Sequence, residues 1–463
     1  MKFSLDAFHS QLSPSFNSIE PAFASAVVGL SGGMDSIVLL HALSELKKQS
    51  KLDFEFRALH VNHGLQQEAE QWQEHCEQIC RQLCVGFTSV SVSVDINTGS
   101  VSGGNSNSTA GLENAAREAR YEAFQQELKA GEVLLLAHHK DDQMETLLLR
   151  LMRGSGSRGL SSIPRSRTVG EGHLLRPLLD FTLAELQQYA DEQQLQWVQD
   201  PSNQDQRFDR NFCRHSLLPM IETRWPGYRD SWSKTITLAE ESETLLCDLA
   251  RIDLINVETE SKSVLRVDKL LLLSNARRRN VLRYWLALLE LPELGWNLLQ
   301  QLAGEILLAE EGALLVCPGF QLRSFKGCVH ALTQMDDFRP KESQKSRLWN
   351  ISETKQIELT DNGSLNTQAV NGKGLSLINI SHLQIKYRQG GEFMRLAGRP
   401  GKSLKKIFQE SGVEPWLRNR IPLLYVNDQL VCIPDLGCSE EYVARAGEPG
   451  LIISWTRPGL EVS

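Results

Sequence analysis

Apolar positions in the first 150 residues follow two alternating spacings. Short apolar runs, or runs with every second residue apolar, lie at residues 26–30, 54–62, 87–94 and 133–137. Between and after these runs, apolar residues recur at helical spacing over residues 37–43, 66–83, 112–128 and 141–152. Strands that alternate with helices form parallel sheets with helices on both faces. We therefore predict a doubly wound α/β domain with a parallel sheet, whose ligands bind beyond the carboxyl ends of the strands.

The rest of the chain changes pattern twice. Helical spacing continues over residues 181–194 and 211–221, and after a break at 225–227 it extends from 228 to about 310. Residues 312–370 are more polar and strand-like, and residues 376–463 combine short strands with a basic helix at 402–410. We predict an α/β domain over residues 1–225, a mainly helical middle domain over 226–335, a linker with strands over 336–375, and a small mixed α+β C-terminal domain over 376–463.

The composition is that of a globular protein and excludes two broad classes. Hydrophobic residues make up 41% of the chain, but the longest apolar runs fall far short of the roughly 18 residues that a membrane span needs. The N-terminus lacks the apolar segment of a secretory signal. Nine cysteines without a CxxC pair indicate a reducing compartment, and those at positions 76, 80 and 84 fit an apolar helix stripe better than a metal site. We expect a cytoplasmic protein with no membrane partner.

Charge is distributed unevenly along the chain. The net charge of −8 argues against a protein that coats nucleic acid over its whole surface. Residues 150–167 nevertheless carry five arginines and no acid, and residues 386–420 carry nine lysines and arginines against three glutamates. These two segments are candidate polyanion sites, and solvated basic faces are the alternative.

A glycine-rich hexapeptide lies between the first predicted strand and the helix after it. It reads Ser31-Gly32-Gly33-Met34-Asp35-Ser36. Two glycines allow a tight turn, so that backbone N–H groups and the helix N-terminus converge on an anion. The serine hydroxyls add donors, and the aspartate can hold a Mg²⁺ that bridges phosphates. Because the lysine of a Walker A loop is missing, we predict a phosphate site of a different kind.

This hexapeptide resembles the PP-loop of ATP pyrophosphatases, which cleave ATP between the α- and β-phosphates and transfer AMP. Together with the loop, five further segments resemble the tRNA(Ile)-lysidine synthase family, in order from LHVNHGL to WVQDPSNQDQRFDRNFCRHSLLP. The most specific stretch is HHKDDQMET at residues 138–146, and residues 402–425 resemble the C-terminal domain of that family. The resemblance covers most of the chain and is weakest at about residues 310–375.

The resemblance implies an ATP-dependent ligase. Members of the family adenylate the C2 carbonyl oxygen of the wobble cytidine in an isoleucine tRNA with a CAU anticodon. The ε-amine of free lysine then displaces AMP, and the resulting lysidine changes codon reading from AUG to AUA and identity from Met to Ile. The implied cofactors are ATP and Mg²⁺. Residues 1–225 are then the catalytic domain, and residues 226–335 and 376–463 bind tRNA. A homodimer is one option for the oligomeric state.

Catalytic candidates follow from this chemistry. Arg117 and Arg120 lie three apart on one predicted helix and can neutralise phosphate charge beside Asp35; an exposed basic helix face is the alternative. A second group follows the strand at 133–137, and its members are candidates for holding lysine or a metal: His138, His139, Asp141, Asp142 and Glu145.

The acidic group at residues 141–145 has two open interpretations. Its carboxylates can attract the ε-ammonium of lysine, and a histidine or carboxylate can accept the proton before attack. Acids at a helix N-terminus are also common as caps and dipole complements. For the metal we expect Asp35 and Asp142, because Mg²⁺ favours carboxylates over imidazoles.

Basic residues in three segments are candidates for tRNA binding. Phosphate attraction and aromatic stacking combine near residues 402–420, where Phe408 and Trp416 lie among the basic residues; a core role for the two rings is the alternative. The tRNA candidates are Arg153, Arg158, Arg207, Arg210, Lys402, Lys405, Lys406, Arg418 and Arg420.

Two other functions compete with the lysine ligase. Another PP-loop tRNA-modifying enzyme, for example a thiolase, usually needs placed and reactive cysteines, and no CxxC pair is present. A tRNA-binding protein without catalysis should have lost Asp35 or the acidic group at 141–145, and both are intact.

Overall fold

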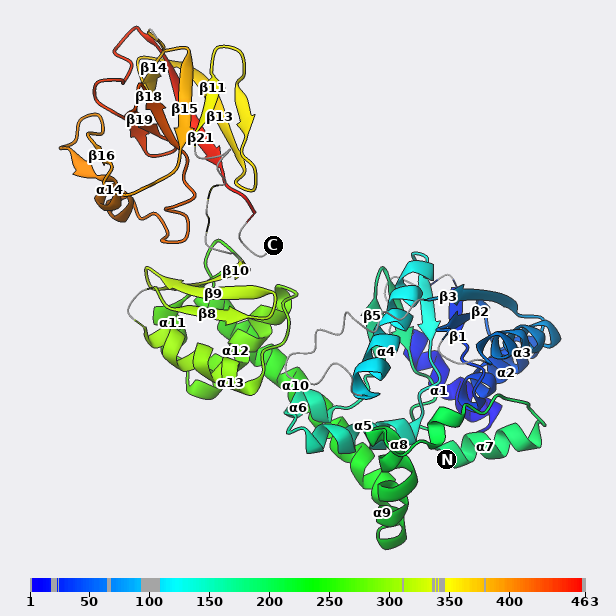
Figure 1. Ribbon diagram of the computed structural model, residues 1–463. Helices are drawn as coiled ribbons and strands as arrows, with labels where there is room; N and C mark the ends of the chain where they lie inside the picture. Colours follow the sequence, from blue (N-terminus) through cyan, green and yellow to red (C-terminus); the bar gives the residue numbers. More distant parts are fainter. Residues whose placement is uncertain are drawn as a thin grey trace. The chain divides into compact units, whose positions relative to one another are not determined.

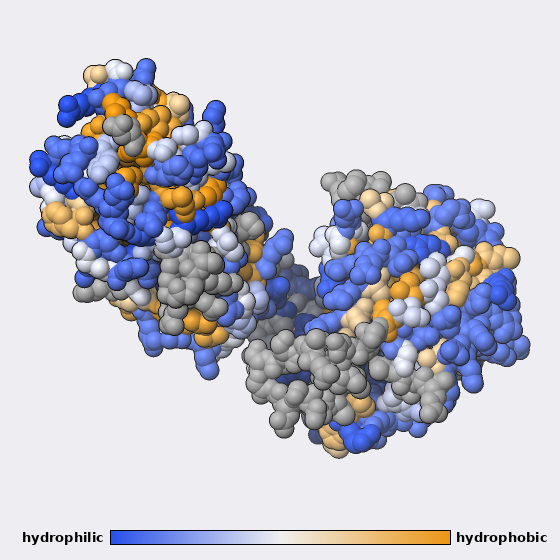
Figure 2. Space-filling model, turned by 45° about the horizontal axis from the view of Figure 1, so that its top comes forward, coloured by the Kyte–Doolittle hydropathy of each residue, from blue (hydrophilic) through white to orange (hydrophobic). Residues whose placement is uncertain are grey.

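The computed structural model divides the chain into two compact units, Met1–Leu245 and Leu246–Ser463 (Figure 1). It describes residues 2–459 except 18–22, 24, 65–67, 93–108, 310, 311, 335–337, 339, 341–345 and 379. Within the described residues, none of the helices has both the length and the apolar character to cross a membrane. Most of the face drawn in Figure 2 is hydrophilic, and its apolar residues gather in separate patches.

A six-stranded sheet forms the centre of the first unit. Its strand order is β3-β2-β1-β4-β6-β5, and all neighbouring pairs are parallel except β5 and β6. The strands are β1 (Ser25–Gly29), β2 (Glu55–Asn62), β3 (Gly86–Ser91), β4 (Glu132–Leu135), β5 (Ser166–Val169) and β6 (Gly172–Leu175). The parallel sheet of the prediction is therefore confirmed, and an edge hairpin that the pattern did not reveal is added to it.

Helices cover this sheet, and its two faces belong to separate hydrophobic clusters. On β1, Ala26 and Val28 pack into one cluster and Val27 into the other, as the alternation of a strand requires. The helices of this unit are α1 (Leu5–Asn17), α2 (Met34–Lys48), α3 (Ala69–Gln82), α4 (Thr109–Glu127), α5 (Lys140–Met152), α6 (Ser157–Leu160), α7 (Leu183–Glu192), α8 (Asp209–Phe212) and α9 (Leu218–Arg224). A 3₁₀ turn (Pro201–Gln204) and a π-helical turn (Cys213–Leu217) precede α8 and α9, respectively.

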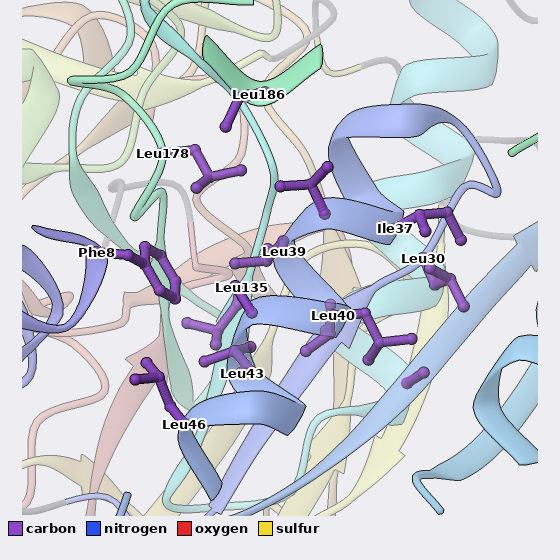
Figure 3. Close-up of a cluster of buried hydrophobic side chains, with 14 of the residues drawn as sticks. Phe8, Leu30, Ile37, Leu39, Leu40, Leu43, Leu46, Leu135, Leu178 and Leu186 are labelled. Carbon is purple, nitrogen blue, oxygen red and sulfur yellow. The ribbon is translucent and has the colours of Figure 1, made fainter. Parts of the chain in front are cut away.

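Helix α2 anchors the loop that precedes it. Leu39, Leu40 and Leu43 are fully buried and point into the core together with Leu135 of β4 (Figure 3). Burying one such side chain contributes about 1.5–3 kcal/mol. The start of α2 is consequently fixed against the carboxyl end of the sheet.

The second unit begins within α10 (Tyr228–Val257) and first forms a small helical region with its own sheet. The helices are α11 (Val267–Leu271), α12 (Asn275–Leu288) and α13 (Trp296–Gln301), followed by a π-helical turn (Leu302–Ile306). The antiparallel sheet has the order β7-β10-β9-β8, with β7 (Val264–Arg266), β8 (Leu314–Cys317), β9 (Phe320–Phe325) and β10 (Cys328–Thr333). Helices are present as predicted, and β8, β9 and β10 lie in the range 312–370 that the pattern marks as strand-like. Strand β7 was not predicted, because three residues are too few to show a periodicity.

Two further antiparallel sheets share one core at the C-terminal end of the second unit. Their orders are β11-β15-β18-β19-β20 and β12-β13-β21-β14. The elements are β11 (Arg347–Asn350), β12 (Gln356–Glu358), β13 (Ser364–Asn371), β14 (Leu375–Ser376), β15 (His382–Lys386), β16 (Phe393–Met394), β17 (Lys402–Ser403), α14 (Leu404–Glu410), β18 (Leu423–Val426), β19 (Gln429–Ile433), β20 (Gly437–Cys438) and β21 (Pro449–Thr456). Because β11 pairs with β15 and β13 with β21, the structure places the described strands of 347–371 in the C-terminal sheets.

Candidate active site

The hexapeptide at residues 31–36 forms a tight turn between β1 and α2. Gly32 has a φ of +87°, and a Cβ atom at this position would lie 3.1 Å from the Sγ of Cys76. Ser36 Oγ donates to the carbonyl of Gly33 at 2.9 Å and lies 3.2 Å from Ser31 Oγ. The N-cap residue of α2 is Gly33, which has no side chain to accept a hydrogen bond, so the first N–H groups of the helix are left for another oxygen. The loop has the geometry of an anion site at a helix N-terminus.

Residues at the carboxyl ends of four parallel strands lie at the same edge of the sheet. Ser31 follows β1, His138 follows β4 and Arg176 follows β6, while His60 lies near the end of β2. The ring of His60 is tied to the sheet, because its Nδ1 lies 2.9 Å from the carbonyl of Leu30. Burial lowers the pKa of His60, so its ring is neutral at physiological pH.

Three carboxylates approach the buried imidazole of His139 at this edge, and Oδ2 of Asp141 lies 3.9 Å from its Nδ1. Nε2 of His139 lies 3.7 Å from Oδ2 of Asp35 and 3.6 Å from Oδ2 of Asp142. Burial raises the pKa of Asp35, and Asp142 adds to this effect while His139 opposes it. Burial also acts to raise the pKa of Asp142, but attraction by His139 and Arg210 outweighs it and the pKa is lowered. The loop aspartate and the helix aspartate of the prediction are thus brought together.

Two arginines neutralise the acidic pair at the start of α5. Arg214 Nε donates to Oε1 of Glu145 at 2.5 Å, and Arg210 Nε donates to Oε2 at 2.8 Å. Both guanidinium groups also donate to Oδ1 of Asp142, that of Arg210 at 2.8 Å and that of Arg214 at 3.2 Å. Glu145 is 0% exposed, so these contacts satisfy a fully buried charge. Arg210, a candidate for tRNA binding, here faces the acidic pair.

The sequence contained a signal for this pairing. The two arginines are four residues apart on a helical segment, and the two acids are three residues apart on another. Each pair therefore projects from one helix face. Only the tertiary structure shows that the two faces meet.

Asp141 has a different environment from its neighbours. Its Oδ2 accepts from the backbone N–H of Leu183 at the start of α7, at 2.7 Å, and its Oδ1 accepts from Nε of Arg229 at 2.8 Å. Both carboxylate oxygens are therefore engaged in holding α7 and α10 to α5. Of the three described acids in this group, Asp142 is the one that lines the adjacent pocket.

A pocket of about 430 Å³ lies at this edge of the sheet. Its lining combines polar residues of the loop and the strand ends, one of the two predicted arginines (Arg120) and several apolar side chains. The polar residues include Ser31, Asp35, Ser36, His138 and Asp142, and the apolar ones include Val61, Trp72, Phe124 and Leu136.

Three arginines surround Tyr121, which also lines this pocket. The guanidinium carbon of Arg117 lies 5.4 Å from the centre of the tyrosine ring, and that of Arg167 lies 4.3 Å from it. The third, Arg176, donates to the phenol oxygen at 3.4 Å. Burial raises the pKa of Tyr121, but these cations outweigh it and lower the pKa. The surroundings of Tyr121 are thus positively charged. Arg167 ends the basic segment 150–167 of the prediction, and Arg176 is an addition that was not among the candidates.

His138 is held as a neutral ring at the edge of the pocket. Its Nδ1 accepts a hydrogen bond from Nε of Arg176 at 3.3 Å. Burial lowers its pKa to about 3, with a smaller contribution from the nearby arginines and an opposing one from Asp142. An imidazole with so low a pKa is a poor base at neutral pH.

The remaining basic candidates differ in exposure and in their contacts. Five of them are exposed: Arg153, Arg158, Arg207, Lys405 and Lys406. Contacts with neighbouring groups include those of Arg207 with Asp205, of Lys402 with Glu410, and of Arg418 and Arg420 with the carbonyls of Val413 and Asp361. Of the two aromatic residues near 402–420, Phe408 is 0% exposed and belongs to the core, which agrees with the alternative to base stacking.

The helix stripe of cysteines is mostly buried, as predicted. Cys76 and Cys80 are fully buried, whereas Cys84 lies after the end of α3 and is exposed. Burial raises the pKa of both buried thiols to about 12. Among the described residues, no group of three or more His, Cys, Asp or Glu is arranged to hold a metal ion.

A Gly-rich anion turn at the carboxyl edge of a parallel sheet defines the class, a PP-loop domain that uses ATP. Family models agree: a PP-loop domain matches residues 6–221, a TilS substrate binding domain 265–330 and a TilS substrate C-terminal domain 383–455. The chain belongs to the tRNA(Ile)-lysidine synthase family, whose members are ATP-dependent ligases that form lysidine at the wobble position of tRNA(Ile).

Curated relatives match over nearly the whole chain. The tRNA(Ile)-lysidine synthase of Pseudomonas syringae pv. tomato is 39% identical, over 88% of this chain and 88% of its own length. The enzyme of Serratia proteamaculans is 38% identical over 93% and 95%, and that of Coxiella burnetii is 36% identical over 91% of each chain.

Proposed function

We propose that the 430 Å³ pocket is where this ligase adenylates the wobble cytidine of a CAU-anticodon isoleucine tRNA. The observation that carries the proposal is that the residue 31–36 turn, Asp35 and Asp142 share one pocket with an apolar wall. The adenosine lies against that wall, and the phosphates lie on the turn and the start of α2, where backbone N–H groups point outward. Donors placed there stabilise pyrophosphate as it departs.

The residues present fit a Mg²⁺ ion. Oδ1 of Asp35 is buried without a hydrogen-bond partner in the described structure, and Oδ2 of Asp142 approaches the same atom of His139, Nε2, as Oδ2 of Asp35 does. Mg²⁺ is commonly held by one or two carboxylates together with substrate phosphates, so a third protein ligand is not required. Asp35 and Asp142 would hold it, and when bound it would neutralise phosphate charge.

Lysine binds beside Asp142 in this proposal. Asp142 is the acid of α5 that lines the pocket, and Asp141 and Glu145 do not line it. All three carboxylates accept hydrogen bonds, those of Asp142 from the two arginines and from the backbone N–H of His139. The lowered pKa of Asp142 keeps the carboxylate ionised and ready to attract the ε-ammonium. Glu145 then acts indirectly, by fixing the two arginines that orient Asp142.

The second unit supplies tRNA contacts in this proposal. Both family matches outside the PP-loop domain describe substrate domains, and Lys405 and Lys406 are exposed on α14 of the C-terminal region. Arg153 and Arg158 are exposed near the end of α5 in the catalytic unit, where they can meet RNA phosphates. The candidates for tRNA binding also include side chains that contact neighbouring groups of the protein: Arg207, Lys402, Arg418 and Arg420.

Thiolation of tRNA is the weaker alternative. The cysteine packed against the turn is Cys76, and burial raises its pKa to about 12. A buried thiol with this pKa carries almost no thiolate at neutral pH, so it is a poor sulfur carrier.

The test is incubation with ATP, Mg²⁺, labelled lysine and CAU-anticodon isoleucine tRNA. We expect AMP release and label in the wobble base, and we expect Asp35→Asn to abolish AMP formation while tRNA binding persists. The matched control is Asp53→Asn, which removes an exposed acid of the same unit and should leave the rate unchanged. Release of ADP and phosphate, or label only with a sulfur donor, would refute the proposal.

A further inference from the structure

Arg176 is a buried cation that no carboxylate neutralises. Its side chain is 2% exposed, yet among the described residues it forms no ion pair with an acid. Its guanidinium instead donates to the carbonyl of Pro164 at 2.6 Å, to the hydroxyl of Tyr121 at 3.4 Å and to Nδ1 of His138 at 3.3 Å. Arg117 and Arg167 lie on the same tyrosine and add positive charge. Burial without a counter-ion is costly, so a role beyond packing is indicated.

The backbone places Arg176 beside His138 with little freedom. β6 pairs in parallel with β4, so Leu175 lies opposite Leu135 and the residues that follow the two strands are neighbours. The N–H of Leu136 donates to the carbonyl of Leu175, and the N–H of Arg176 donates to the carbonyl of Arg165. The register places Arg176 next to Leu136, two residues before His138, which brings the arginine side chain within reach of the histidine.

The direction of this hydrogen bond fixes the tautomer of His138. A guanidinium N–H can donate but cannot accept, so Nδ1 of the histidine must be the acceptor. The ring proton then resides on Nε2. Arg176 does not line the pocket, but two of its partners, His138 and Tyr121, do. The arginine therefore acts on the reacting groups through these side chains, and its bond to His138 is the one that sets the position of a ring proton.

We propose that Arg176 is a positioning residue, which holds His138 as an Nε2–H donor toward a phosphate oxygen of ATP during adenylation. The pocket places His138 together with Ser31 and Asp35 of the turn that receives the phosphates. A preorganised N–H donor stabilises charge that develops on such an oxygen. His138 is thereby excluded as the base that deprotonates lysine. The inference rests on the proposed ATP position.

The first experiment is a double-mutant cycle on Arg176 and His138. It measures the release of pyrophosphate from ATP in the presence of tRNA and in the absence of lysine. Arg176→Met and His138→Ala should each slow single-turnover release by about 100-fold. Because one residue acts through the other, the double variant should be no more than about threefold slower than the slower single variant. Effects that multiply in the double variant, or an unchanged rate for Arg176→Met, would overturn the inference. If the wild type releases no pyrophosphate, the proposed function fails instead.

A matched control separates positioning from stability. Arg57→Met removes a part-buried arginine of the same sheet that bonds Glu132 and lies outside the pocket lining. It should lower stability without slowing pyrophosphate release.

The second experiment reads the tautomer directly and does not depend on folding of a variant. In ¹⁵N-histidine-labelled wild-type enzyme, the His138 ring, identified by the signal that His138→Ala removes, should show a protonated Nε2 and an unprotonated Nδ1. In Arg176→Met the two tautomers should become mixed. A protonated Nδ1 in the wild type would overturn the inference.

Discussion

Replacing Arg214 with methionine should destabilise the catalytic unit strongly, because the change removes a partner of a buried carboxylate. Glu145 is 0% exposed and receives three hydrogen bonds, two of them from Arg214, at 2.5 Å and 3.0 Å. The variant leaves Oε1 without its donor and one arginine, Arg210, to balance two carboxylates. Breaking a buried pair by removal of one partner costs about 3–5 kcal/mol.

Hydrogen exchange of the core strands measures this loss. In peptides that cover β1 and β4, amide exchange through unfolding of the unit should accelerate by roughly 150-fold to 5,000-fold, since 1.4 kcal/mol corresponds to tenfold. Arg81→Met is the control, because its pair with Glu77 is exposed and contributes only about 0.3–0.5 kcal/mol. The double variant Arg214→Met/Glu145→Leu should exchange more slowly than Arg214→Met. An acceleration below tenfold for Arg214→Met would refute the reasoning.

Three further experiments test other parts of the structure. Gly32→Ala places a residue with a Cβ atom at φ +87°, which should lower the free energy of unfolding by about 1–2 kcal/mol and slow pyrophosphate release. An unchanged rate would contradict the requirement for glycine at this turn. Lys405→Ala/Lys406→Ala should weaken tRNA binding and reduce the salt slope of log K by about 1–2, measured by filter binding; unchanged affinity removes α14 from the interface. At pH 8, iodoacetamide should label exposed Cys84 well before Cys80, whose pKa burial raises to about 12; equal labelling by mass spectrometry contradicts this.

The fold of the catalytic unit followed from local pattern to a large extent. The strands at 26–30, 54–62 and 133–137 and the loop after the first of them could be read because apolar spacing and glycine turns are local properties. The antiparallel hairpin β5–β6 and the strand β7 could not be read in the same way. These strands are three or four residues long, and their pairing with other strands, which local pattern does not encode, stabilises them.

The candidate site shows the same division. The sequence by itself determined that an anion turn, Asp35 and an acidic helix start follow parallel strands, and strand direction alone brings such residues to one edge. Only the tertiary structure decided which charges meet: Arg210 faces Asp142 and Glu145, and Arg176 reaches His138. Long side chains find their partners across elements, and no spacing along the chain encodes which buried charge will neutralise which.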